Sequence, residues 1–400
     1  MAPWVRTLLE VGKTAAMGLA AGGLALGLVN LLPQFVKIEH SITELRTVLF
    51  ADHASSTSRD VAVVGIDENS LAGLPYLSPV DRGYMAALVT RIAAAEPRAI
   101  VLDISFDRRT DPASDRALAL ALRTLPVPVV ILETDAPLDR EFQTEFLNTA
   151  NRPLGDPMGA TTVDGVIRHI PPSENGRCSL AEATVKVLTT PALRQTPVCN
   201  RTWPLRIDWL LEPPGLQTFS YLPANAVMTP SLVPGQTERL RGKVVLIGGV
   251  FESIDRHKTA LSALHADDQT DASTGSGQLG GSTMPGVMIH AQVLQQLLDG
   301  RVRHEPDAIG LGLLLLASGL AGAALSSRQS FRSRWGVLSL VTAVSLIVID
   351  IGLFKFARFV LPGDAVAIAV FLGFQFNSVR LSHRAGGLPQ AGKTIGEAIL

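Results

Sequence analysis

The sequence predicts an α/β domain, built on a parallel or mixed sheet flanked by helices, and attached to four transmembrane helices. Two short apolar runs rich in β-branched residues, 61–66 and 99–104, are typical of strands buried on both faces. An aspartate lies at or next to the end of each run. Helical patterns alternate with runs of this kind, which is typical of α/β folds. Four longer stretches with almost no charged residues have the length of membrane spans.

The composition favours a membrane protein over a nucleic-acid-binding one. Of the 400 residues, 47% are hydrophobic but only 5% are aromatic, and 35 Lys and Arg against 36 Asp and Glu leave a formal net charge of −1. The apolar residues are unevenly spread, which indicates membrane spans beside a soluble part. Because no basic stripe with interleaved aromatic residues appears, we expect no nucleic-acid partner.

The first predicted span covers residues 14–32, after a cytoplasmic N-terminus of residues 1–13. Arg6 and Lys13 precede this span, and basic residues accumulate on the cytoplasmic side of membrane helices. A cleaved signal peptide is the alternative. We interpret the span as a signal anchor, because no convincing cleavage site precedes Pro33.

Small residues in the first span recur at the spacing that lets transmembrane helices approach each other closely. The pairs are Gly18 with Gly22 and Gly23 with Gly27. This spacing favours a homodimer formed through the first span, although it also arises by chance in spans rich in alanine and glycine.

Three further spans, 308–325, 336–354 and 359–379, follow the soluble region. The loop between the first two and the tail over 380–400 are rich in basic residues, so both should be cytoplasmic. These residues are Arg328, Arg332, Arg334, Arg380, Arg384 and Lys393. We expect a multi-pass protein of the bacterial inner membrane with both termini inside and residues 36–305 in the periplasm or outside the cell.

Asp350 is an acidic residue inside the third span. An unpaired carboxylate in a bilayer is costly, so we expect this side chain to have a partner or to reach water. Lys355 and Arg358, which follow closely in the sequence, are the candidate partners.

Within residues 36–305, helices and strands alternate. The predicted helices cover 38–49, 81–95, 115–125, 180–188 and 287–298, and the predicted strands cover 61–66, 99–104, 127–132, 205–211 and 243–249. Residues 265–284 are dominated by Asp, Ser, Thr, Gly and Gln, which predicts a flexible loop.

The two cysteines, Cys178 and Cys199, both lie in the soluble region. In an exported domain such a pair usually forms a disulfide, whereas free thiols are the alternative if the domain is cytosolic. Neither cysteine has neighbours at metal-ligand spacing, so we expect no metal site.

Three candidate ligand-binding residues lie where predicted strands end. Asp67 and Glu68 follow the first strand, and Asp103 ends the second. In open α/β sheets, ligands bind at the carboxyl ends of strands, which favours a pocket here. The alternative for both aspartates is hydrogen bonding to backbone N–H groups of a turn.

Four more candidates lie at other element ends. Arg82 opens a helix, and it could equally be a structural partner of Asp67 or Asp103. Asp255 and His257 lie on a loop, where function is often carried, whereas His290 lies on an apolar helix and also fits a core histidine.

Two glycine motifs resemble nucleotide-binding sequences without the required context. Residues 275–280 match the dinucleotide fingerprint but lie in a polar loop, and residues 387–394 match a phosphate-binding loop but follow a membrane span. We therefore expect no cofactor.

In order and spacing, these segments resemble the CHASE2 family of extracellular sensor domains over residues 36–380. The matching pieces are Val64–Leu71, Arg82, Ala99–Phe106, Asp164–Arg168, Leu240–Gly248, Asp255–His257 and Met284–Ala291. The chain departs from the family pattern at Tyr76–Asp81, where a Trp-Pro pair is usual, and at Thr259, where a Thr-Pro is usual. Relatives of this layout commonly carry a cyclase or kinase after the last span, and residues 380–400 are too short for one.

The resemblance implies an integral-membrane sensor that is not an enzyme. It would detect an unknown small molecule or protein and signal to a separate cytoplasmic or membrane output protein. The alternatives are an extracytoplasmic enzyme using Asp67, Asp103 and His257, and a structural subunit of a membrane complex.

Overall fold

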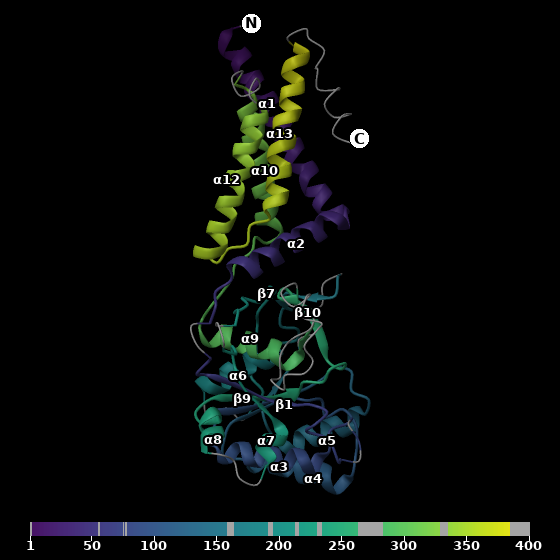
Figure 1. The fold of residues 1–400 in the computed structure, drawn as a ribbon. Coiled ribbons are helices and arrows are strands. Elements are labelled where there is room, and N and C mark those ends of the chain that lie inside the picture. Colours follow the sequence, from purple (N-terminus) through teal and green to yellow (C-terminus); the bar gives the residue numbers. More distant parts are fainter. Residues whose placement is uncertain are drawn as a thin grey trace. The chain divides into compact units, whose positions relative to one another are not determined.

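The computed structural model divides the chain into two compact units (Figure 1). One, here called the helical unit, is Met1–Arg46 with His304–Leu400, and the other, the sheet unit, is Thr47–Arg303. The described residues are 2–54, 57–74, 76, 78–157, 164–190, 195–212, 216–229, 234–262, 283–328 and 335–384. Most of the predicted loop over 265–284, most of the tail and both glycine motifs lie outside them.

The sheet unit is built on six strands in the order β4-β3-β2-β9-β1-β8, and every pair of neighbours is parallel. The strands are β1 (Val61–Ile66), β2 (Ala99–Asp103), β3 (Val129–Leu132), β4 (Leu154–Gly155), β8 (Ser220–Pro223) and β9 (Val244–Gly249). The last of these in the chain, β9, is inserted between β1 and β2. The predicted parallel sheet is therefore confirmed.

Two hydrophobic cores lie on opposite faces of this sheet. Side chains alternate between them along each strand, so that Val61 and Val63 join one core and Ala62 and Val64 join the other. Helices α6 (Leu180–Thr189) and α9 (Gly286–Leu298) cover the first face. The second face is covered by α3 (Arg82–Ala94), α4 (Pro112–Thr124), α5 (Arg140–Ala150), α7 (Ala224–Met228) and α8 (Pro234–Leu240).

Smaller strands extend the sheet unit on the α9 side. β11 (Met284–Pro285), β10 (Arg256–Thr259) and β5 (Val166–Ile167) form one sheet, and β6 (His169–Ile170) pairs with β7 (Leu205–Arg206) in another. The structure also joins Cys178 to Cys199 in a disulfide, with Cα atoms 5.0 Å apart.

The predicted strand over 205–211 is shorter than expected, because helix α9 takes over its backbone hydrogen bonds. Gln296 Oε1 accepts from the Asp208 N–H at 2.8 Å, and Gln292 both accepts from the N–H of Leu210 and donates to its carbonyl. The segment is thereby held by side chains instead of by a neighbouring strand.

The helical unit contains α1 (Pro3–Leu31), most of α2 (Pro33–Phe50), α10 (Ala308–Ser326), α12 (Trp335–Phe356) and α13 (Gly363–Arg384). Among the described residues, three helices are long and apolar enough to cross a membrane: α1, α10 and α13. The remaining predicted span, 336–354, lies within α12, which is not one of these three.

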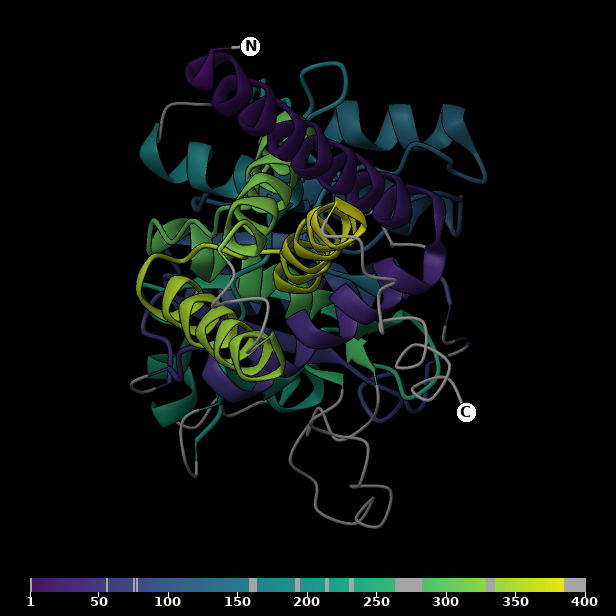
Figure 2. The ribbon, with the colours of Figure 1, turned by 90° about the horizontal axis from the view of Figure 1, so that it is seen from above.

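Contacts near their ends define the directions of the three apolar helices. The segments that precede α10 and α13 pair through His304 and Phe359, and near the other end Asn377 of α13 donates to the Ala323 carbonyl of α10 at 2.8 Å. These two helices therefore run parallel. Arg380, near the end of α13, contacts Glu10 near the start of α1, so α1 runs antiparallel to both. Figure 2 views the molecule from the end where α1 begins and α13 ends.

Candidate functional site

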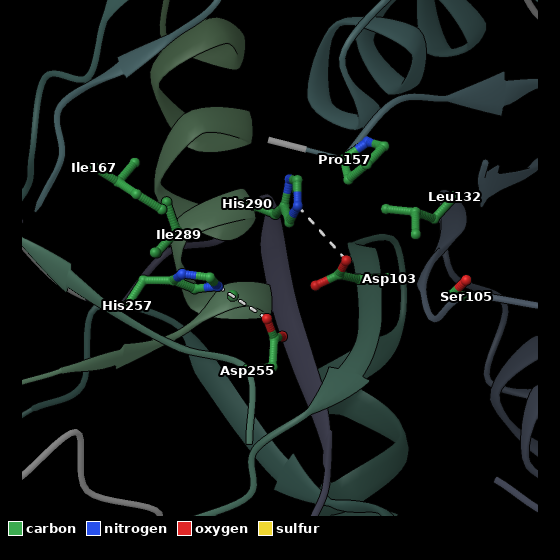
Figure 3. A pocket seen from close by; sticks show the side chains of 10 residues that line it. Asp103, Ser105, Leu132, Pro157, Ile167, Asp255, His257, Ile289 and His290 are labelled. Atoms are coloured by element: carbon green, nitrogen blue, oxygen red, sulfur yellow. Dashed lines mark hydrogen bonds and ion pairs between the residues drawn. The ribbon is translucent and has the colours of Figure 1, made fainter. Parts of the chain in front are cut away.

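A cavity of about 260 Å³ opens at the carboxyl ends of β2 and β3, beside the first turns of α9 (Figure 3). Its lining residues are Asp103, Ser105, Leu132, Pro157, Ile167, Asp255, His257, Gly286, Ile289 and His290. Four of the seven ligand-binding candidates from the sequence, Asp103, Asp255, His257 and His290, thus come together here. We call this cavity the carboxyl-edge pocket.

Two glycines allow α9 to lie close to the strand ends. Gly248 pairs with Asp103 in the sheet, and a Cβ on it would lie 2.7 Å from the Val287 Cβ of α9. A Cβ on Gly286, the first residue of α9, would lie 2.6 Å from an Asp255 carboxylate oxygen. A larger residue at Gly248 would push the helix away, and one at Gly286 would displace the Asp255 carboxylate. The close packing brings His290, one turn further along α9, opposite Asp103.

The side chains of Asp103 and His290 are buried next to each other, but they do not form a hydrogen bond. Their side chains are 9% and 6% exposed, and His290 Nε2 lies 3.6 Å from Asp103 Oδ1, which is too long for a hydrogen bond. Burial raises the pKa of the Asp103 carboxyl; His290 and His257 lower this pKa, and the Asp255 carboxylate raises it. The pocket therefore contains a carboxylate that is costly to keep charged.

The second carboxylate–imidazole pair is well formed and more exposed. His257 Nε2 lies 2.9 Å from Asp255 Oδ1, and the side chains are 34% and 44% exposed. This hydrogen bond raises the pKa of His257. Figure 3 shows both histidines directed at their aspartates.

Three buried polar atoms of the pocket have no hydrogen-bond partner among the described residues: Asp103 Oδ2, Ser105 Oγ and His290 Nδ1. Buried polar groups in folded proteins are nearly always satisfied, so atoms of this kind in a cavity mark places for water or a ligand. Ser105 was not among the sequence candidates. Two sequence signals pointed to it: its position two residues after Asp103, beyond a strand end, and its place within the matching piece Ala99–Phe106.

Asp67 and Glu68 lie outside the pocket lining. Asp67 accepts from the Ser70 N–H at 2.7 Å and closes the turn after β1, as in the alternative interpretation of this residue. Glu68 accepts from the backbone N–H of Glu252 at 3.1 Å. Both carboxylates hold loops at the sheet edge.

Arg82 is fully buried on the other side of the sheet. Its Nε lies 3.2 Å from Asp115 Oδ1, and its guanidinium stacks 4.9 Å from the centre of the Phe106 ring. Its acidic partner is therefore Asp115, from the first turn of α4, instead of Asp67 or Asp103.

The described residues contain no group of three His, Cys, Asp or Glu side chains placed to hold a metal ion. The lining of the carboxyl-edge pocket combines polar side chains with the apolar Leu132, Pro157, Ile167 and Ile289, and this combination is typical of sites for organic molecules.

The chain thus combines a parallel α/β domain, which has a pocket at its carboxyl edge, with three apolar helices in the described residues that can span a membrane. Residues 17–324, well over half of the chain, match the family model of the CHASE2 domain. The chain therefore belongs to the CHASE2 domain family, which is a family of sensory domains. Searches of curated proteins and of solved structures found no match.

Proposed function

We propose that this protein is a membrane sensor that binds a small ligand in the carboxyl-edge pocket and transmits the binding through its helices. The observation that carries the proposal is that three residues lining one cavity each have a buried polar atom without a hydrogen-bond partner, as counted over the described residues. Because the ligand can shift an equilibrium only by binding one state better, the pocket must differ between two states.

Helix α9 supports a route from the pocket to the end of the sheet unit. Its first residues, including His290, line the pocket, and Gln292 and Gln296, which follow on the same helix, bind the backbone of 206–210. A ligand that repositions His290 would therefore move this segment together with the helix.

The segment over 205–211 also contacts the chain near both ends of the sheet unit, where the chain enters it and where the chain leaves it. On the incoming side, the Leu211 N–H donates to the Asp52 carbonyl at 3.0 Å. On the outgoing side, the buried Asp208 accepts from Arg303 Nε at 2.7 Å and from Arg301 Nη1 at 3.2 Å. A movement of α9 would thus reach both points where the chain leaves this unit.

The parallel arrangement of α10 and α13 supports a chain that crosses the membrane four times. If both helices cross the membrane in the same direction, the chain between them must cross back, and α12 is the helix that lies between them in the sequence. Its residues Val341, Val344, Ile347, Val348 and Ile349 are each more than half exposed, as expected of side chains that face lipid.

The basic residues near the spans favour both termini in the cytoplasm and the sheet unit outside, in a bacterial inner membrane. A membrane-impermeant thiol reagent tests this. A cysteine at Leu138, which is 69% exposed, should react in intact cells, whereas a cysteine at Arg6 should react only after the cells are ruptured. The reverse pattern would contradict the orientation.

The signal would pass to a separate cytoplasmic or membrane output protein through the spans or the basic segments. An enzyme using Asp67, Asp103 and His257 receives less support, since Asp67 lies outside the pocket lining. A purely structural subunit would need no ligand pocket. Ligand binding would therefore distinguish a sensor from a structural subunit.

Hydrogen exchange on the full-length protein in nanodiscs tests the sensor proposal. A panel of small amines, carboxylates, sugars and alcohols is screened for stabilisation, and a compound that binds should slow exchange in 286–298 and in 205–211. Asp103→Asn should weaken this binding by about tenfold or more, because a buried charged acceptor is lost. Asp60→Asn, the same change on an exposed residue at the amino edge of the sheet, should have no effect.

If no compound of the panel binds in a way that depends on Asp103, the pocket is not a sensor site. Binding without slower exchange in 205–211 would contradict the proposed route through α9.

A further inference from the structure

We infer that the ligand of the carboxyl-edge pocket is a small organic ammonium ion that keeps at least one N–H, such as a primary amine with a short hydrocarbon part. The inference rests on the sensor proposal and names the chemical class that this pocket recognises. It follows from the charges, the hydrogen-bonding atoms and the shape of the lining.

The charge of the lining favours a cation. Among the described residues, the lining contains two carboxylates, Asp103 and Asp255, and neither lysine nor arginine. Asp255 already has His257 at 2.9 Å, whereas the charged partner of Asp103 in the described part of the chain is His290 at 3.6 Å. An anion placed beside Asp103 would meet a buried carboxylate without a compensating guanidinium or ammonium. A cation would supply the charge that this carboxylate lacks.

The unpartnered atoms favour a ligand that donates hydrogen bonds. Asp103 Oδ2 is an acceptor when the carboxyl is ionised. If His290 carries its proton on Nε2, facing Asp103, its Nδ1 is also an acceptor. The Ser105 hydroxyl can accept or donate. An ammonium group supplies up to three N–H donors, and hydrogen bonds between charged groups are stronger than those between neutral groups.

The remaining walls favour a short aliphatic part and a free N–H. Leu132, Pro157, Ile167 and Ile289 form the apolar lining, and about 260 Å³ limits the ligand to a small molecule. Among the described residues, the lining contains no Phe, Tyr or Trp ring of the kind that forms a cage around quaternary ammonium ions. A tetramethylated cation also has no N–H to give to Asp103 Oδ2.

A bare metal cation is a poorer match, because no three acidic, histidine or cysteine side chains gather around one point in the described part of the chain. The pocket combines one strong acceptor with a hydrocarbon wall, and that combination suits an amine.

Ligand-observed NMR on the full-length protein in zwitterionic nanodiscs tests the inference, with n-propylammonium, tetramethylammonium and butyrate as probes. We expect n-propylammonium to bind at least about tenfold more tightly than either of the other two, because only it pairs a positive charge with N–H donors. Asp103→Asn should weaken its binding about ten- to hundredfold, and Asp60→Asn should leave it unchanged.

The dependence on pH gives a second measurement. The titratable groups that line the pocket are Asp103, His290, Asp255 and His257. Since burial raises the pKa of Asp103, protonation competes with the ammonium ion, and binding should tighten as the pH rises through the pKa of this carboxyl. Butyrate would show the opposite trend if it entered the pocket with a proton.

Several outcomes would overturn the inference. Preferred binding of butyrate, equal binding of tetramethylammonium, no binding of n-propylammonium, or binding unaffected by Asp103→Asn each contradict it. If Asp103→Asn does not fold, Ser105→Ala replaces it, with a smaller expected loss of n-propylammonium binding, and an unchanged affinity then counts against the inference. The sensor proposal survives if a carboxylate, sugar or alcohol binds in an Asp103-dependent way, and both fail if nothing enters the pocket.

Discussion

Replacing Gly22 with leucine is expected to destabilise the helical unit severely, whereas the same change at the adjacent Gly23 is expected to leave it folded. A Cβ on Gly22 would lie 2.6 Å from the Leu315 carbonyl oxygen and the Leu316 Cα of α10. A backbone cannot move aside as a flexible side chain can, so α1 and α10 would have to separate. A Cβ on Gly23 meets no described atom within 4 Å.

Gly22→Leu should lower the free energy of unfolding by about 3 kcal/mol, which is at the upper end of the effects of overpacking. It can be measured as a lower midpoint of SDS-induced unfolding of the purified protein. Equal losses for both variants would contradict the packing of α1 on α10. Gly23→Leu also tests the proposed homodimer, because it fills the second small-residue pair, Gly23 with Gly27, and should abolish a dimer formed there without unfolding the chain.

The second large effect is expected at Arg46, which is 4% exposed in the helical unit. Its guanidinium forms an ion pair with Asp350 of α12, lies 3.1 Å from Glu39 Oε1, and donates to the Leu361 carbonyl at 2.9 Å. Arg46→Ala would leave the buried Asp350 and the partly buried Glu39 without their cation. Removing one partner of such a pair typically costs about 3–5 kcal/mol.

A double-mutant cycle separates this pair from the other contacts of Arg46. Arg46→Ala and Asp350→Asn should each destabilise the protein, and the double variant should lose clearly less than the sum, since Asp350 is costly only while it is charged and unpaired. Lys37→Ala, on the exposed side of the same helix, serves as the control and should change little. Strict additivity would show that Arg46 and Asp350 are not coupled.

The ion pair of Asp350 shows one limit of sequence reasoning. The expected partners were the nearby Lys355 and Arg358, yet the structure pairs Asp350 with Arg46, 304 positions away in the chain. Sequence spacing can suggest only local partners. The fold of the bundle brings the end of α12 next to α2, and no local pattern encodes that approach.

The pocket shows a second limit. Asp67 and Asp103 were expected to frame one site because each ends a strand. The structure inserts β9 between β1 and β2, which separates the two strand ends by two strand spacings, about 10 Å. Asp103 therefore faces α9, while Asp67 closes its own turn.

Local sequence patterns were sufficient to predict these strands and this helix. The apolar runs at Val61–Ile66 and Ala99–Asp103 and the helix at Gly286–Leu298 match their predicted ranges closely, because burial on both faces or a helical period leaves a direct signal over a few residues. The same signals indicated an α/β fold with membrane helices and selected four side chains that line the pocket. Only tertiary structure decided which of those side chains meet, since strand order and helix approach depend on contacts between residues far apart in the chain.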